Sequence, residues 1–341
     1  DCDGVKDNAV PVCDNGLASN SNTGTDYAKA IDLCQFTIEA PPQKDKKWGV
    51  ISAGLFRGNG AGAPDAAAKS IRTSFGTGGI VPQQNNSLAV FSTGNAADLN
   101  DANPAYADFQ TGKDNGANST APADWLAANG NKFPNAPGCP AANGTAANNS
   151  VMLKIRVRVP TNAKSFNVST YFYSAEYPEW VCSPYNDFYL TLLDSTFVPG
   201  VGQSPNPADK NLAFYDPPPA GPPYYPVGVN LAYGNTGLFS QCKSGQTGCS
   251  YGVLGNCTCA STSKLTGTGF DASTPPGVGC GANNLAGGAT DWLTTDAPVV
   301  SGETITLDLS VFDVSDGTLD SLVVLDNFRW SSLPATVSTH E

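Results

Sequence analysis

YSAEYPEWVCSPYNDFYLTLLD, residues 173–194, is the stretch of this chain that decides the fold. It begins as the end of one strand, turns at Pro178 and Pro184, and continues as a second strand from Phe188. The turn contains four oxygen-bearing side chains, which are Glu176, Glu179, Asn186 and Asp187. The pattern therefore predicts an acidic turn between two strands.

A second acidic segment, VFDVSDGTLDSLVVLDNFRW, occupies residues 311–330. Its first acid, Asp313, extends a row of inward-facing apolar residues: Ile305, Leu307, Leu309 and Val311. A carboxylate at the end of a buried row costs several kcal/mol unless it is paired or bound to a metal. Arg329 is one candidate partner, and a cation is the other.

The candidate ligands are hard oxygens, and the sole histidine, His340, is close to the end of the chain. Calcium therefore fits best. We expect at least two of Glu176, Asp187, Asp313 and Asp320 to coordinate one Ca²⁺, and the further candidate ligands are Glu179, Asn186 and Asp316. The alternative is that these acids cap turns, as Asp and Asn commonly do.

The first residues, DCDGVKD, place Asp1, Asp3 and Asp7 around a glycine. This D-x-D-G-x-x-D spacing is similar to calcium loops of thrombospondin-type and related bacterial modules, although it is shorter than an EF-hand loop. We expect a second calcium site here, and a solvated acidic terminus is the alternative.

Alternating apolar residues predict strands near 151–159, 166–172, 188–192 and 305–311, and a closing strand at 319–330. Shorter strands are expected at 36–39, 48–53 and 88–94. Residues 25–34 give the one good helix pattern, with Thr25 or Asp26 as its cap. The sequence thus predicts an all-β fold, a β-sandwich of jelly-roll type with one short N-terminal helix and long disulfide-held loop insertions.

The expected organisation is an acidic calcium-type segment at 1–20, a single sandwich domain at 21–335 and a tail at 336–341. Two insertions, 95–148 and 199–300, are rich in Gly, Pro and Asn. We expect them to bury little by themselves, so that disulfides, calcium, glycan or a neighbouring subunit must order them.

Composition excludes several classes of protein. The net charge is −12, which repels phosphate backbones and makes nucleic acid an unlikely partner. No apolar run reaches the ~18 residues of a membrane span. The chain begins at Asp1 rather than Met, so we expect a removed signal peptide and an extracellular or cell-surface location.

Ten cysteines are present: Cys2, Cys13, Cys34, Cys139, Cys182, Cys242, Cys249, Cys257, Cys259 and Cys280. Their even number and their place in loops favour disulfides, and Cys2–Cys13 and Cys242–Cys249 are plausible local bridges. Zinc fits poorly without a suitable histidine. Candidate glycosylation sequons begin at Asn85, Asn118, Asn143, Asn148, Asn167 and Asn256.

The segments SAEYPEWV (174–181) and NDF (186–188) resemble the core motif of the bacterial choice-of-anchor L surface domain. Residues 88–94, 298–303 and 313–327 are similar to that family's supporting blocks, so the resemblance covers about 26–330. Ala175 stands where an acid is usual. The cysteine-rich insertion is not part of the pattern, and it resembles insertions in secreted proteins of myxobacteria and related soil bacteria.

The resemblance implies a non-enzymatic, calcium-stabilised structural protein, a subunit of an extracellular filament, surface layer or adhesive assembly that associates with itself or another extracellular subunit. One alternative is a carbohydrate-binding module that uses Tyr224, Tyr225 and Trp292 on a glycan. A less favoured alternative is a glycoside hydrolase that uses Glu176 or Glu179, because carboxylates that hold a cation are not free to transfer protons.

Overall fold

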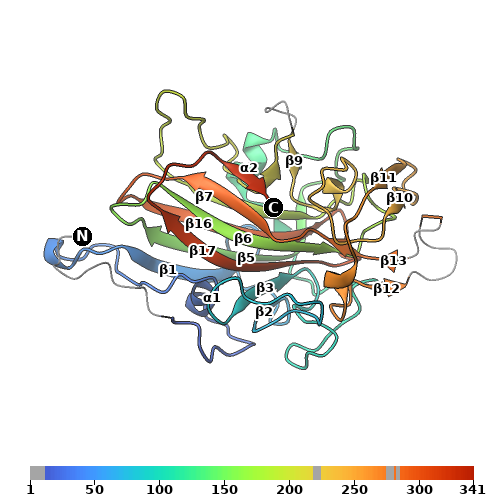
Figure 1. Cartoon of the computed structure of the whole chain (residues 1–341), viewed down its shortest axis with the longest axis horizontal. Helices are drawn as coiled ribbons and strands as arrows, with labels where there is room; N and C mark the ends of the chain where they lie inside the picture. Colours follow the sequence, from blue (N-terminus) through green and yellow to red (C-terminus); the bar gives the residue numbers. More distant parts are fainter. Residues whose placement is uncertain (1–11, 218–223, 274–279, 282–284) are drawn as a thin grey trace.

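The computed structural model describes residues 12–217, 224–273, 280–281 and 285–341. Two antiparallel sheets form a β-sandwich (Figure 1), which confirms the predicted all-β class. The first sheet has the order β1 (Gly49–Phe56), β5 (Ala146–Arg158), β16 (Thr304–Val314) and β7 (Phe188–Asp194), and β4 (Ser119–Thr120) pairs with β5.

The second sheet has the order β18 (Ser338–His340), β15 (Leu293–Pro298), β6 (Ser165–Ser174), β17 (Ser321–Ser331), β3 (Leu88–Ser92) and β2 (Lys69–Arg72), and β14 (Gly288–Ala289) pairs with β6. From β5 onward the long strands alternate between the two sheets. The β6–β7 and β16–β17 connections therefore each cross from one sheet to the other.

The core lies between the sheets because each long strand turns an apolar row inward. Val151, Leu153 and Ile155 of β5 meet Phe172 of β6 and Val323 of β17 in one buried cluster. The predicted rows of β5, β6 and β16 are buried in this core, whereas the row of β7 (Phe188, Leu190 and Leu192) is buried on the opposite face of the first sheet. Helix α1 spans Gly24–Ala30, and its N-cap is Thr23. This cap lies two residues before Thr25, the nearer of the two predicted caps.

Short elements surround the sandwich. These are α2 (Ala123–Ala128), the 3₁₀ turns η1 (Gln43–Asp45), η2 (Val229–Leu231) and η3 (Ser263–Leu265), and the strand pairs β8 (Phe214–Tyr215) with β9 (Tyr225–Pro226), β10 (Gly245–Thr247) with β11 (Gly255–Cys257) and β12 (Ala272–Ser273) with β13 (Leu285–Ala286). The last two pairs lie at one end of the molecule in Figure 1.

The expectation that the two insertions bury little is wrong. Trp125 and Phe133 of the first insertion are buried against Phe188 of β7 and Phe312 of β16, on the face of the first sheet away from the main core. The second insertion supplies β15 to the second sheet and adds Leu231 and other residues to the core. Such segments can pack on the sandwich as extra layers, because their few large side chains bury much apolar area.

Three smaller expectations also need correction. Residues 36–39 form only a single bridge, Phe36 to Val50, rather than a strand. The tail at 336–341 contains β18, which pairs with β15. The strands expected from the sequence do not include β2, which lies inside the glycine- and alanine-rich stretch 59–79.

Four disulfides join Cys13–Cys34, Cys139–Cys182, Cys242–Cys259 and Cys249–Cys280. The expected Cys242–Cys249 bridge is therefore wrong, and so is Cys2–Cys13, since Cys13 pairs with Cys34. Cys2 itself lies outside the described residues. Cys139–Cys182 links the first insertion to the acidic turn. Among the described residues, no helix is long and apolar enough to cross a membrane.

Candidate functional site

The two acidic segments meet where the β6–β7 and β16–β17 connections cross between the sheets. Asp187 joins them directly. Its Oδ1 accepts a hydrogen bond of 3.1 Å from the Val314 amide, and its Oδ2 accepts one of 2.6 Å from the Ser321 hydroxyl. The side chain therefore ties the start of β7 to the end of β16 and the start of β17.

Asp313 is fully buried beside this junction, as its place in the apolar row predicted. The β16–β5 register shifts between Val311 and Asp313. The Asn149 side-chain amide donates a hydrogen bond of 3.1 Å to Oδ2 of Asp313, whereas Oδ1 of Asp313 has no hydrogen-bond partner. The nearby Thr93 hydroxyl lowers the pKa of Asp313. This hydroxyl donates its hydrogen bond to the Ser321 carbonyl, at 3.3 Å.

Glu176 is the third buried acid, with 2 % of its surface exposed. Its Oε2 has no hydrogen-bond partner. Glu176 also lines a cavity of about 40 Å³, together with Trp180, Tyr185, Asp316, Thr318 and Leu319. The aromatic pair Trp180 and Tyr185 packs edge to face, with ring centroids 5.3 Å apart.

Electrostatics sets these three acids apart from ordinary surface carboxylates. Burial, and then the neighbouring Asp313, raises the pKa of Glu176 well above its usual value. Burial, followed by the charge of Glu176, raises the pKa of Asp187 well above its usual value. Burial, followed by the charge of Asp187, raises the pKa of Asp313 in the same way. In the part of the chain that the structure describes, no lysine or arginine forms a salt bridge with any of them.

Such a group has two ways to avoid buried like charges, which are to hold protons or to share a cation. Calcium takes carboxylate and carbonyl oxygens at about 2.3–2.6 Å. In the part of the chain that the structure describes, the three acids do not bring three carboxylate oxygens within 4.8 Å of one another, and the group that meets this spacing is Cys242, Cys257 and Cys259. The unpartnered Oε2 of Glu176 and Oδ1 of Asp313 are the atoms with free ligand capacity.

Asp320 and Asp316 are placed differently from the three. Asp320 is buried, and both of its oxygens lie 3.2–3.3 Å from the Lys113 amide. Burial raises its pKa to about 7, and the hydrogen bond from the Lys113 amide and then the Lys113 charge partly offset that rise. The charge of Asp320 in turn raises the pKa of Asp313. Asp316 is exposed and accepts hydrogen bonds from the amide and hydroxyl of Thr318. It caps its own turn, as the alternative interpretation of these acids predicted.

Glu179, Asn186 and Arg329 are not brought into the group. Burial raises the pKa of Glu179, with no neighbouring acid among the causes. The Asn186 side-chain oxygen accepts 3.2 Å from the Asn230 amide. Arg329 is exposed and donates to Gln84, so it is not the partner of Asp313. Asp1, Asp3 and Asp7 lie outside the described residues.

A second acidic group was missed by the sequence reasoning. Asp14, Asp32 and Asp326 gather near a bulge in β17 between Asp326 and Arg329. Burial, followed by the charge of Asp32, raises the pKa of Asp326 to about 8, and burial raises that of Asp32 to about 6. The one sequence signal was an acid, Asp326, that directly follows the apolar run 322–325 of a strand.

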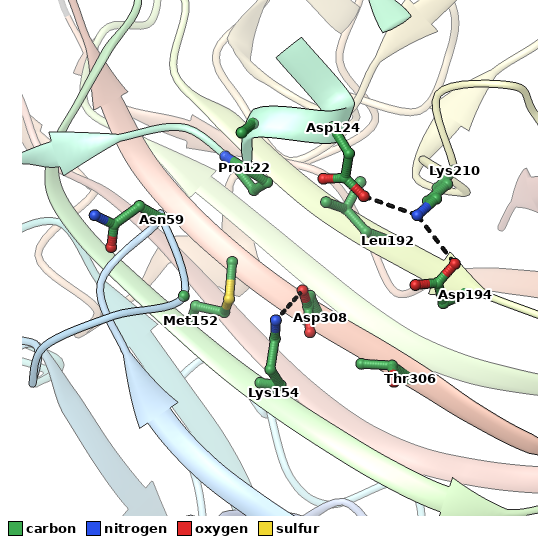
Figure 2. A pocket seen from close by; sticks show the side chains of 12 residues that line it. Asn59, Pro122, Asp124, Met152, Lys154, Leu192, Asp194, Lys210, Thr306 and Asp308 are labelled. Atoms are coloured by element: carbon green, nitrogen blue, oxygen red, sulfur yellow. Dashed lines mark hydrogen bonds and ion pairs between the residues drawn. The ribbon is translucent and has the colours of Figure 1, made fainter. Parts of the chain in front are cut away.

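A cavity of about 130 Å³ lies on the outer face of the first sheet (Figure 2). Lys210 bridges Asp124 and Asp194 at 2.8 and 3.0 Å, and Lys154 contacts Asp308 at 3.1 Å. Oδ1 of Asp308 is buried without a hydrogen-bond partner. Met152, Leu192 and Pro122 supply apolar walls.

The proposed sugar-binding aromatics do not form one platform. Trp292 is only partly exposed and packs edge to face on buried Tyr171. Tyr224 and Tyr225 pack instead on Phe214 and Tyr215 of the β8–β9 pair.

The sequons differ in how free their asparagine side chains are. Asn118, Asn143 and Asn256 are exposed, whereas the Asn85 amide donates to Asp32 and the Asn148 amide to the Asp316 carbonyl. Asn167 lies within β6, partly buried. Of the exposed three, Asn118 is held by a hydrogen bond of 3.0 Å that its side-chain oxygen accepts from the Asn149 backbone amide.

No family model, curated protein or solved structure matches this chain.

Proposed function

We propose that the chain is a non-enzymatic extracellular structural protein whose sandwich is stabilised by one calcium ion held by Glu176, Asp187 and Asp313. The observation that carries this proposal is the group of three buried acids with no salt-bridge partner at the junction of two connections. An ion there would join both sheets. The disulfides support the extracellular location, since such bonds persist in oxidising compartments.

Thermal unfolding with calcium and with a chelator tests the proposal. A ligand that binds only the folded state stabilises it by about 2.7 kcal/mol at a hundredfold excess over Kd. We expect the wild type to melt several degrees higher with calcium. Identical melting curves, together with no metal in the isolated protein, would refute the site.

Two variants of β16 locate the effect. Asp313→Asn removes a proposed ligand and should abolish the calcium-dependent rise in Tm. Asp308→Asn changes an acid on the same strand that already has Lys154 as a partner, so its calcium response should match the wild type. A calcium response that survives Asp313→Asn would place the ion elsewhere, for example in the N-terminal acidic segment.

We also propose self-association into an extracellular filament, surface layer or adhesive assembly. The exposed apolar side chains of Val198 and Val201, which lie together on the loop after β7, support this proposal. The edges of the sandwich support it less. Residues 35–37 hydrogen-bond to the start of β1, and residues 210–212 to β7, so little of these edges is open for strand addition.

Carbohydrate binding remains the second candidate function, and the larger cavity of Figure 2 favours it over the tyrosines and Trp292. The cavity offers carboxylate, ammonium, amide and hydroxyl groups over apolar walls, which is the mixture that a sugar needs. A glycan array with the wild type and Asp308→Ala tests it. Binding that Asp308→Ala abolishes supports this candidate, and the absence of any binding removes it.

A further inference from the structure

Three sulfur atoms lie together beside the β10–β11 pair. Cys242 and Cys259 form a disulfide, and Cys257 is the one unpaired cysteine among the described residues. Its Sγ is 3.9 Å from the Cys242 sulfur and 3.9 Å from the Cys259 sulfur. A buried thiol thus lies within contact distance of both atoms of a disulfide, and a rotation of the Cys257 side chain that brings its sulfur into line with the S–S bond completes the geometry that thiol–disulfide exchange requires.

We propose that Cys257 exchanges with this disulfide, so that the thiol moves to Cys259 and can there form mixed disulfides with small external disulfides. The Cys257 thiolate attacks the Cys242 sulfur and forms the Cys242–Cys257 bond. The Cys242–Cys259 bond breaks, and Cys259 leaves as the thiolate. The step needs no oxidant, because one disulfide and one thiol are present before and after it.

Both sulfurs that carry the thiol in this exchange lie beside polar groups. In the pairing described, Cys257 lies 3.7 Å from the Phe239 carbonyl; burial raises its pKa, and a side-chain hydrogen bond with Tyr177 lowers it in part. The Cys259 sulfur is 3.6 Å from the Tyr177 hydroxyl, which donates a hydrogen bond of 2.6 Å to the Lys243 carbonyl.

Exposure distinguishes the two positions of the thiol. Cys257 is buried and closed to reagents, whereas Cys259 is only half-buried. Once Cys259 is the thiolate, it can attack an external disulfide and release one external thiol. The external sulfur stays on Cys259 as a mixed disulfide, so atoms and electrons balance.

The pH sets the rate of this exchange. Burial raises the pKa of Cys257 to about 11. Only the thiolate attacks, so below this pKa the rate should rise about tenfold for each pH unit. The other disulfides, such as Cys13–Cys34, have no described thiol beside them and serve as internal controls.

The test treats native wild-type protein with oxidised glutathione at several pH values, followed by an acid quench and digestion by an acid-active protease, which prevents reshuffling. We expect glutathione on Cys259 together with a Cys242–Cys257 linkage, in amounts that grow with pH. Glutathione on Cys257 with Cys242–Cys259 intact, or on neither residue, would overturn the proposal. A product at Cys2 is a separate peptide and does not count.

One variant completes the test. Cys257→Ala removes the attacking sulfur and should leave Cys259 unmodified and bonded to Cys242, whereas glutathione on Cys259 of this variant would overturn the exchange route. Cys13–Cys34 should stay intact in both proteins.

Discussion

At the scale of single residues, burial without a counter-charge is what distinguishes a ligand candidate from an ordinary acid. Asp308 and Asp313 lie five positions apart on β16, yet Asp308 contacts Lys154 and Asp313 has only the neutral Asn149. Asp187 and Asp320 add like charge to Asp313 rather than compensating it. This difference identifies the site more specifically than the abundance of acids in the sequence.

Asp326 and Asp32 give a prediction for the pH dependence of stability. Their pKa values in the folded protein, about 8 and about 6, exceed the ordinary 3.8, so the folded state binds more protons than the unfolded state. The stabilisation is complete below pH 4 or so and is lost as the pH rises through about 6 and then 8. In chelator, the Tm should fall across this range.

The variant Asp326→Asn carries an uncharged amide and should reduce that fall, measured by calorimetry. The matched control is Asp45→Asn, because Asp45 is exposed and is not among the groups that shift the pKa of Asp326 or Asp32, so its substitution should leave the slope unchanged. Equal slopes in the wild type and Asp326→Asn would show that this carboxyl is not protonated in the folded protein.

At the scale of elements, the insertions act as layers of the sandwich. Trp125 on α2 and Phe133 pack on Phe188 and Phe312, which are next to the acidic junction in sequence. The first insertion therefore covers the strand ends that carry Asp187 and Asp313. Its order does not require a neighbouring subunit.

Trp125→Ala tests this packing. Removing a fully buried tryptophan costs about 3–5 kcal/mol. We expect that loss in denaturant unfolding, together with faster proteolysis within 95–148. Leu99→Ala is the control, since Leu99 is half exposed and lies in the same insertion. A loss below about 1 kcal/mol, in the range of ordinary surface changes, would mean that the insertion is only loosely attached.

The strands with period-two apolar rows could be predicted from the sequence, and so could the burial of Asp313, because both follow from local alternation. The meeting of the two acidic segments also followed from the chemistry of a buried carboxylate. The pairing of the cysteines could not be predicted, since the sequence of a loop does not specify which other loop it approaches. Nor could the Asp14–Asp326 group, whose members come from three separate segments joined only by tertiary packing.

At the scale of the whole molecule, disulfides fix the loops that hold the site. Cys182 lies between Glu176 and Asp187, and its bond to Cys139 fastens the acidic turn to the first insertion. The second insertion also packs on this turn, where the Ser250 amide donates to the Glu179 carbonyl. We infer that the turn is preorganised for the ion by contacts from both insertions.

Removing Cys139–Cys182 by a double substitution to Ala should lower stability by about 2–5 kcal/mol. It should also weaken calcium binding, measured by titration calorimetry on protein that is still folded. The double Ala variant of Cys13–Cys34, remote in sequence from the turn, should keep the wild-type calcium affinity. Equal affinities in the two variants would contradict the preorganisation of the turn.

Self-association belongs to this scale as well. Light scattering at micromolar concentration with calcium should show species larger than one chain of 35.2 kDa. Val198→Ser with Val201→Ser should shift the distribution toward the monomer, because the exposed apolar contact is lost. A wild type that remains monomeric would refute the assembly while leaving the calcium site untouched.

The most direct test of the central claim is terbium luminescence at the acidic junction. Terbium replaces calcium on oxygen ligands, and the Trp180 side chain, which shares a cavity with Glu176, can sensitise its emission. The account predicts emission that calcium competes away, that falls in Trp180→Phe, that is lost in Asp313→Asn and that persists in Asp308→Asn. Emission that is absent from the wild type, or unchanged in Asp313→Asn, would contradict a cation at this site.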